Sequence, residues 1–429
     1  MTVTRRTLLA SAGAASLTGL LASCAGLTGQ QQGGSKADTL TFTAWGTDQE
    51  VAAYKSLIAK FEAAHKGVTV KPNFVPYAQM FTNIDAQLSA GNAPDVFRVG
   101  YTQVAGYAAQ DQLLDLSDAL SSEERAAFTP AFLTAVTYKD KPFGVPQQAD
   151  TSAIVYNKKA LETAGVGAVP DRVDDAWSYD ELRGVLTKLR GSLKSSQFPF
   201  AYNWQIGGSF RWLSFVFASG GRLLDDALTK SAIESPQGTR ALDFTREFFE
   251  KKFVPANDST KSNTYADTDF PDVTAMVVAN QSVLGEFEAK KVDWGVTYLP
   301  QDVRGAAELS GNALVATKAG KQTDLAVEFL KFMVQEDSMR SFCRSALELP
   351  TLESIADADL HWKAPTGVIP AYAAQATKVT AQDAEQVSVP AFAQINTVLT
   401  NELEAAFRQG RSTADTLRAI ATGVDGAIA

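Results

Sequence analysis

The chain has 429 residues, which is too long for one small hydrophobic core and predicts two or three domains. Its composition, 45% hydrophobic and 20% charged, is that of an ordinary soluble globular protein. The formal net charge of −9 argues against a nucleic-acid partner, because binding phosphates requires clusters of Lys and Arg that the sequence lacks.

The amino terminus is typical of an export signal. The pair Arg5-Arg6 fits the twin-arginine type, and the apolar run that follows over residues 8–21 is too short for a membrane span of about 20 residues. Residues 21–24, Leu-Ala-Ser-Cys, resemble the lipobox of bacterial lipoproteins, in which the cysteine is acylated. We therefore predict a signal peptide over residues 1–23, lipidation of Cys24 and a flexible tether over residues 24–37.

A plain buried cysteine in an N-terminal helix is the alternative for Cys24. If Cys24 is acylated, Cys343 is the remaining cysteine of the chain, so neither an internal disulfide nor a cysteine-based metal site is expected. Cys343 is then most simply a small buried apolar residue.

Strands and helices alternate along the first part of the mature chain. Hydrophobic periodicity predicts strands over residues 39–45, 68–74 and 95–99, and helices over residues 50–64, 79–90 and 104–110. This alternation predicts a largely parallel, doubly wound sheet, in which ligands bind beyond the carboxyl ends of the strands. The residues at those ends are Trp45, Gly46, Gly100, Tyr101 and Gln103.

The segment over residues 141–157 is predicted to cross from one lobe to another. Pro146 fixes its own φ, extends Val145 and is poorly tolerated in a central strand. The polar side chains that would face the cleft are Gln147, Gln148, Asp150 and Thr151. An ordinary loop leading into an edge strand is the alternative.

Several motifs resemble those of the extracellular solute-binding proteins of ABC importers, in particular the maltose-binding-like group that binds carbohydrates. The motifs are Ala90-Gly91-Asn92-Ala93-Pro94-Asp95, Phe143-Gly144-Val145-Pro146, Tyr156-Asn157-Lys158 and Trp177-Ser178-Tyr179-Asp180. The chain departs from the family's pattern by an inserted residue between Trp177 and Asp180, by Thr274 and Phe287, and by Gly311-Asn312 in place of a Gly-Gly turn.

The resemblance implies an α/β, two-lobe periplasmic-binding-protein fold, each lobe a largely parallel sheet flanked by helices, joined by crossing hinge strands. Residues 38–145 and 300–348 would form the first lobe. Residues 146–299 and 349–429 would form the second. The implied function is to capture a sugar by hinge closure and to deliver it to the transmembrane subunits of an ABC permease. The resemblance also implies a monomer that its lipid anchors to the extracytoplasmic face of the cell membrane.

No convincing catalytic constellation occurs in the sequence. The two histidines, His65 and His361, do not have a metal-binding spacing. The sequence also contains no Gly-x-Ser-x-Gly elbow, no Walker loop and no glycine fingerprint for a dinucleotide. We therefore expect a binding protein that is not an enzyme and has no cofactor or metal. An extracytoplasmic carbohydrate-active enzyme is the alternative from another class, although it would require two carboxylates held across a cleft.

Carbohydrate is the expected ligand, because aromatic rings stack on the C–H face of a sugar and planar polar groups bind its hydroxyls. The predicted ligand-binding residues are Trp45, Asp48, Tyr101, Gln103, Gln147, Asp150, Trp204, Glu286, Phe287 and Asn312. Arg211 is a weaker candidate for holding vicinal hydroxyls or an anionic group. A non-sugar solute, such as a polyamine or a glycerophosphodiester, remains an alternative in the same fold.

The same residue types also have structural interpretations. Trp212 and Trp294 are expected in the core, Trp177 is expected to staple the start of a helix, and Asp95 is expected to brace the turn at Pro94. For Trp204, ligand contact is the favoured interpretation, so replacing it by Ala is predicted to weaken binding while leaving thermal stability nearly intact.

Overall fold

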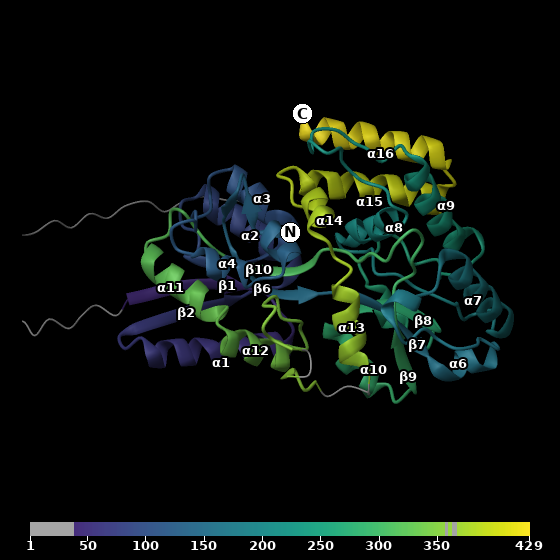
Figure 1. Ribbon diagram of the computed structural model, residues 1–429, viewed down its shortest axis with the longest axis horizontal. Coiled ribbons are helices and arrows are strands. Elements are labelled where there is room, and N and C mark those ends of the chain that lie inside the picture. The colour runs from purple at the N-terminus through teal and green to yellow at the C-terminus, as the bar shows by residue number, and fades with distance from the viewer. Residues whose placement is uncertain (1–37, 357–358, 363–366) are drawn as a thin grey trace, which may run out of the picture. The chain divides into compact units, whose positions relative to one another are not determined.

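The computed structural model describes residues 38–356, 359–362 and 367–429 (Figure 1). The predicted signal peptide, the tether and Cys24 lie outside these residues. Residues from Ala37 to Ala429 cluster as one unit, and this unit contains both sheets described below.

The first sheet has five strands in the order β2-β1-β3-β10-β6. Its strands are β1 (Asp38–Ala44), β2 (Val68–Phe74), β3 (Val96–Gly100), β6 (Val145–Asp150) and β10 (Ser310–Ala316). β1 pairs in parallel with β2 and β3, as the sequence predicts, whereas β10 runs antiparallel to both β3 and β6. The connecting helices are α1 (Asp48–Ala64), α2 (Tyr77–Ser89) and α3 (Tyr101–Ala109), followed later in the chain by α11 (Thr323–Met333) and α12 (Glu336–Ala346).

The second sheet corrects the expectation that each lobe is largely parallel. It consists of β7 (Ser152–Asn157) between β8 (Met276–Asn280) and β9 (Trp294–Thr297), and β7 is antiparallel to both neighbours. β8 and β9 therefore run in the same direction, and the connection that contains α10 (Leu284–Ala289) carries the chain past β7.

One extended segment joins the two sheets. β6 ends at Asp150 and β7 begins at Ser152, so only Thr151 separates a strand of the first sheet from a strand of the second (Figure 1). This confirms the predicted crossing. Pro146 is tolerated because β6 is an edge strand, and the pairing with β10 shifts register beside it. The change of sheet falls at Thr151 rather than at Pro146.

The remaining helices and strands surround these sheets. They are α4 (Ser122–Ala126), α5 (Pro130–Ala135), β4 (Thr137–Tyr138), β5 (Lys141–Pro142), α6 (Lys158–Thr163), η1 (Val173–Asp175), α7 (Tyr179–Ser192), η2 (Gly208–Trp212), α8 (Leu213–Ala218), α9 (Pro236–Glu250), η3 (Ala266–Asp269), η4 (Gln281–Val283), α13 (Val368–Ala376), α14 (Ala381–Val387), α15 (Phe392–Gln409) and α16 (Thr413–Ile428). α13 packs on β7 and β9, and α15 packs on α16 and α9. However, α14 also packs on α5 and α15 on α3, so these C-terminal helices contact both halves of the fold.

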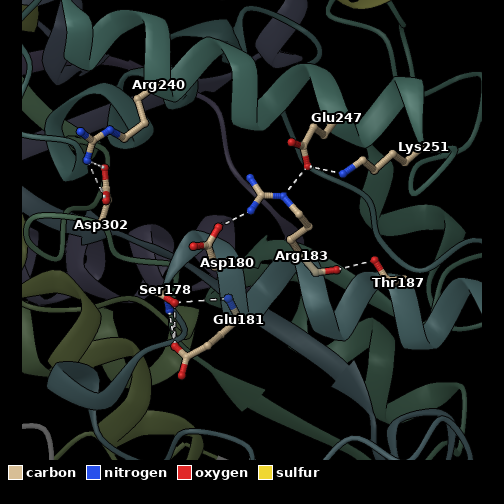
Figure 2. Close-up of polar contacts among 9 residues, drawn as sticks. All are labelled: Ser178, Asp180, Glu181, Arg183, Thr187, Arg240, Glu247, Lys251 and Asp302. Carbon is tan, nitrogen blue, oxygen red and sulfur yellow. Dashed lines mark hydrogen bonds and ion pairs between the residues drawn. The ribbon is translucent and has the colours of Figure 1, made fainter.

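Polar contacts fix the start of α7 and join it to α9 (Figure 2). Ser178 caps α7: its Oγ accepts a hydrogen bond from the Glu181 backbone N–H, and the Glu181 carboxylate accepts one from the Ser178 N–H at 2.8 Å. Arg183 of α7 donates to Glu247 of α9, which also accepts from Lys251. The inserted residue after Trp177 thus still permits a complete capping box.

Three predictions about the core are confirmed. Trp212 and Trp294 are buried, and Cys343 is buried with no exposed surface. Trp177, which the sequence predicts to staple a helix start, is also buried and lies just before α7. Asp95 accepts hydrogen bonds from the Thr41 backbone N–H at 2.8 Å and the Lys321 N–H at 2.9 Å, which fixes the turn before β3 as expected.

Asp258 is a buried acid beneath the loop that follows Tyr202. Its carboxylate accepts hydrogen bonds from the Tyr202 N–H at 3.1 Å and from Gln205 Nε2 at 2.6 Å. Burial raises the pKa of Asp258 from 3.8 to about 8. The folded protein therefore holds this proton more tightly than the unfolded chain does, so the Asp258 contribution to the free energy of unfolding falls as the pH rises from 3.8 to about 8.

We predict that Asp258→Asn removes this loss, which amounts to about 1.4 kcal/mol for each pH unit within that window. Gln205 Oε1 is buried with no hydrogen-bond partner in the described part of the chain and is free to accept from the new amide. Urea unfolding at about pH 5 and about pH 9 measures the change. The matched control is Asp226→Asn, since the Asp226 side chain is 95% exposed. Equal pH dependence in wild type and Asp258→Asn would contradict the prediction.

Candidate functional site

A cavity of about 600 Å³ is the candidate site. One wall comes from the residues that follow β1, β2 and β3, which is the position that parallel-sheet topology predicts. The opposite wall comes from the loops of the second sheet and from the start of α15. Asp150 at the end of β6, Ser310 at the start of β10 and Glu348 also line the cavity, and we call this part of it the floor.

The first wall carries an aromatic cluster. The Trp45 ring centroid lies 5.4 Å from that of Tyr77 and 5.5 Å from that of Phe81. Trp45 follows β1 directly, and the next residue is Gly46, where a Cβ would lie only 2.9 Å from Glu50 Cβ. The close approach of α1 therefore requires glycine after Trp45. Tyr77 is 43% exposed, so part of its ring is accessible to a ligand.

A buried ion pair lies beneath this cluster. Arg98 is 1% exposed and donates to the Glu50 carboxylate and, at 2.8 Å, to the Trp45 carbonyl oxygen. Its guanidinium carbon lies 4.8 Å from the centre of the Trp45 ring. With its amide oriented to satisfy its neighbours, Asn312 Oδ1 accepts from Arg98 Nη2 and Gln148 Nε2, each at 2.8 Å. Arg98 thus fixes both Trp45 and Asn312 at the cavity.

Gln281 connects the second sheet to the crossing segment. Its Oε1 accepts from the Thr151 backbone N–H at 3.1 Å, and its Nε2 donates to the Ala149 carbonyl oxygen at 2.9 Å and to Glu348 at 2.7 Å. Burial, together with the nearby Asp150 carboxylate, raises the pKa of Glu348 well above its usual value. Burial therefore favours the protonated form of Glu348, whose carboxyl group lies in the cavity floor.

The second wall is more polar. Asn203 bridges two segments: its Oδ1 accepts from the Ala266 N–H at 2.8 Å, and its Nδ2 donates to Asp267 at 2.9 Å. Arg211 of η2 lines the cavity, with its Nε 3.8 Å from the buried carboxylate of Glu308. Tyr265, 38% exposed, completes this side.

Half of the predicted ligand-binding residues line this cavity, namely Trp45, Tyr101, Gln103, Asp150 and Asn312, and the weaker candidate Arg211 lines it too. Tyr101 is nevertheless only 1% exposed, and its hydroxyl donates to the Gln148 carbonyl oxygen. The Tyr101 hydroxyl therefore already donates its hydrogen bond within the protein.

The structure does not bring the other five to the cavity. Trp204 has no exposed surface and packs against Tyr202, Phe249 and Phe407, with ring centroids 4.9, 5.7 and 5.0 Å away. Its loop folds back onto α9 and α15, so the aromatic side chain that the sequence suggested for a ligand belongs to the core.

The other four predicted ligand-binding residues are either buried elsewhere or exposed outside the cavity. Phe287 packs 5.0 Å from Phe270 in the core, and Gln147 is buried with its Oε1 accepting from the Tyr54 hydroxyl at 2.6 Å. Asp48 and Glu286 are exposed to solvent on α1 and α10 and do not line the cavity.

Sequence reasoning missed several residues of the cavity wall. Tyr77 follows β2 as Trp45 follows β1, so the rule for carboxyl ends of strands would have found it. No local signal marks the others, because they reach the cavity from distant segments; they are Asn203, Phe210, Tyr265, Asp267, Phe392 and Asn396.

Two features are absent from the described residues. In these parts of the chain no helix has the length and hydropathy needed to cross a membrane. Within the same residues, no group of three or more His, Cys, Asp or Glu side chains could hold a metal ion.

Comparison with known proteins gives consistent results. The family described as bacterial extracellular solute-binding protein matches residues 45–340. The diacetylchitobiose binding protein DasA of Streptomyces coelicolor is 24% identical over 365 residues, which cover 82% of this chain and 83% of DasA. The maltodextrin-binding protein MdxE of Bacillus subtilis is 24% identical over 310 residues, 69% of each chain.

Solved structures share the fold. The GacH receptor of Streptomyces glaucescens superposes with a TM-score of 0.76 at 19% identity, covering 91% of this chain and 98% of the receptor. The maltotriose binding protein of Thermus thermophilus superposes with a TM-score of 0.73 at 22% identity, covering 91% of this chain and all of the other. Because the family match spans more than half of the sequence, this chain belongs to the bacterial extracellular solute-binding proteins.

Proposed function

We propose that the protein is the substrate-binding component of an ABC importer and captures a sugar or oligosaccharide in the cavity between the two sheets. The observation that carries the proposal is the cavity itself. Trp45 and Tyr77 offer ring faces on one wall, and Asn312, Asp150 and Arg211 offer hydrogen-bonding groups around them. Diacetylchitobiose and maltodextrin, the ligands in the names of two relatives, are both oligosaccharides.

Capture would proceed by closure of two lobes. We assign residues 38–145 and 300–348 mainly to the first lobe and residues 146–299 and 349–429 mainly to the second, with the change of sheet at Thr151. A ligand that contacts both walls binds the closed state more tightly than the open state, and this difference in affinity stabilises the closed state. The closed protein would then deliver the ligand to the transmembrane permease.

Membership of the family implies an extracytoplasmic location. We further propose that acylation of Cys24 anchors the protein to the membrane, that it acts as a monomer, and that it binds its ligand without chemical conversion. Binding without catalysis is supported by the use of cavity carboxyl groups as structural partners, since Glu50 pairs with Arg98 and Glu348 accepts from Gln281.

A thermal-shift screen tests the proposal. We expect maltotriose, diacetylchitobiose or a related neutral oligosaccharide to raise the melting temperature in a concentration-dependent way, because a ligand that binds only the native state stabilises it. Polyamines, amino acids and glycerophosphodiesters serve as comparison ligands. If one of these raises the melting temperature and no sugar does, the assignment to carbohydrate is wrong although the fold remains.

A further inference from the structure

The two arginines that line the cavity differ in their hydrogen bonding. Arg98 uses its two terminal nitrogens on Trp45, Glu50 and Asn312. The Arg211 side chain donates no hydrogen bond to any residue that the structure describes, and its Nε is buried without an acceptor within hydrogen-bonding distance. The N–H groups of Arg211 are therefore donors of the cavity wall that have no hydrogen-bond acceptor among the described residues.

Packing nevertheless holds Arg211 in place. Its guanidinium carbon lies 5.0 Å from the centre of the Phe210 ring, and its side chain is only 14% exposed. A Cβ on Gly208 would lie 2.4 Å from Arg211 Nη1, so the guanidinium packs directly against Gly208 and a side chain at position 208 would collide with it. A planar donor that is fixed before binding loses little conformational entropy when it meets a ligand.

Acidic groups surround Arg211. Glu308 is buried 3.8 Å from its Nε, and Asp150 and Asp267 line the same cavity. Burial raises the pKa of Asp267, and Asn203 and Arg211 oppose that rise. Burial likewise raises the pKa of Glu308 against the effect of Arg211. Arg211 therefore already has carboxyl groups beside it, and a ligand carboxylate would have to approach their oxygen atoms.

We propose that Arg211 selects neutral saccharides by donating two parallel hydrogen bonds to adjacent ligand oxygens, while Asp150, Asp267 and Glu308 disfavour ligands that carry a carboxylate. The guanidinium fork suits a pair of adjacent acceptor oxygens, and a neutral sugar presents such a pair as vicinal hydroxyls. The inference rests on the proposed function, because it requires a saccharide in this cavity.

Calorimetric titration of purified wild type and variants tests this role. The ligands are maltotriose and diacetylchitobiose as neutral probes and trigalacturonate as the acidic probe. Arg211→Lys keeps the charge opposite Glu308 but removes the fork, and Arg211→Ala removes both. The control is Arg240→Ala, since Arg240 pairs with Asp302 away from the cavity (Figure 2).

We expect both Arg211 variants to bind the neutral probe about 10- to 100-fold more weakly than wild type. Arg211→Lys should unfold at the same urea concentration as wild type, and Arg240→Ala should bind as wild type does. Trigalacturonate should bind wild type more weakly than the neutral probe does. An effect on affinity without an effect on stability separates ligand contact from a purely structural role.

Two results would overturn the inference. One is that Arg211→Lys binds the neutral probes with the same affinity as wild type. This result overturns the inference even if Arg211→Ala does not fold. The other is tighter binding of trigalacturonate than of either neutral probe. In both cases wild type still binds a saccharide, so the proposed function stands. If wild type binds no saccharide at all, the proposed function fails and the role of Arg211 fails with it.

Discussion

Replacing Glu50 by Gln should lower the free energy of unfolding by about 3–5 kcal/mol, because the substitution leaves the charge of Arg98 buried and unpaired. Glu50 is 5% exposed and Arg98 is 1% exposed, so water cannot take the place of the lost carboxylate. The amide of Gln can still accept the Thr47 N–H that caps α1. Urea unfolding at neutral pH measures the loss.

The control for this prediction is an ion pair near the surface. Arg240 and Asp302 are 54% and 20% exposed, and Asp302→Asn should cost no more than about 1 kcal/mol. A similar small cost for Glu50→Gln would show that the Glu50–Arg98 pair contributes no more than a surface pair. Since both residues line the cavity, Glu50→Gln should also disturb the position of Trp45 and reduce affinity for the ligand.

Replacing Trp204 by Ala should also lower the free energy of unfolding by about 3–5 kcal/mol, as expected when a large buried aromatic side chain is removed. Trp204 has no exposed surface and packs against rings from α9 and α15. The sequence suggested the opposite result, a loss of binding at constant stability. Urea unfolding of the unliganded variant decides between the two.

Trp45→Ala is the matched comparison. Trp45 is half-buried and lies on the cavity wall, so its removal should reduce ligand affinity much more than it reduces stability. If Trp204→Ala weakens binding while its unfolding is unchanged, the Trp204 side chain must contact the ligand and our placement of it in the core is wrong.

These two tryptophans show what the sequence could predict. Trp45 follows a strand whose neighbours were recognisable from nearby residues, and parallel-sheet topology then placed it at the cavity. The environment of Trp204 depends on Phe407, which lies far along the chain on α15. No pattern within a short window contains that contact, so the Trp204 side chain was mistaken for a ligand contact, although its neighbours Asn203 and Ile206 do line the cavity.

The same distinction applies to the fold. The β-α-β units of the first sheet follow from local periodicity, and the crossing segment follows from the chemistry of Pro146, although the change of sheet itself falls at Thr151. The directions of β8 and β9 follow from how their connections pass β7, which periodicity does not encode. Most of the second cavity wall could not be predicted for a related reason, since separate segments contribute to it.

The single residue between β6 and β7 also limits how the chain can change in length. Side chains alternate between the two faces of a strand, so inserting or deleting one residue reverses the face of every side chain beyond that point. Here β6 and β7 form one nearly continuous strand with only Thr151 between them. A change of length within Val145–Asp150 would therefore shift the pairing of β6 with β10, of β7 with β8 and β9, or of both, whereas a substitution there alters one side chain.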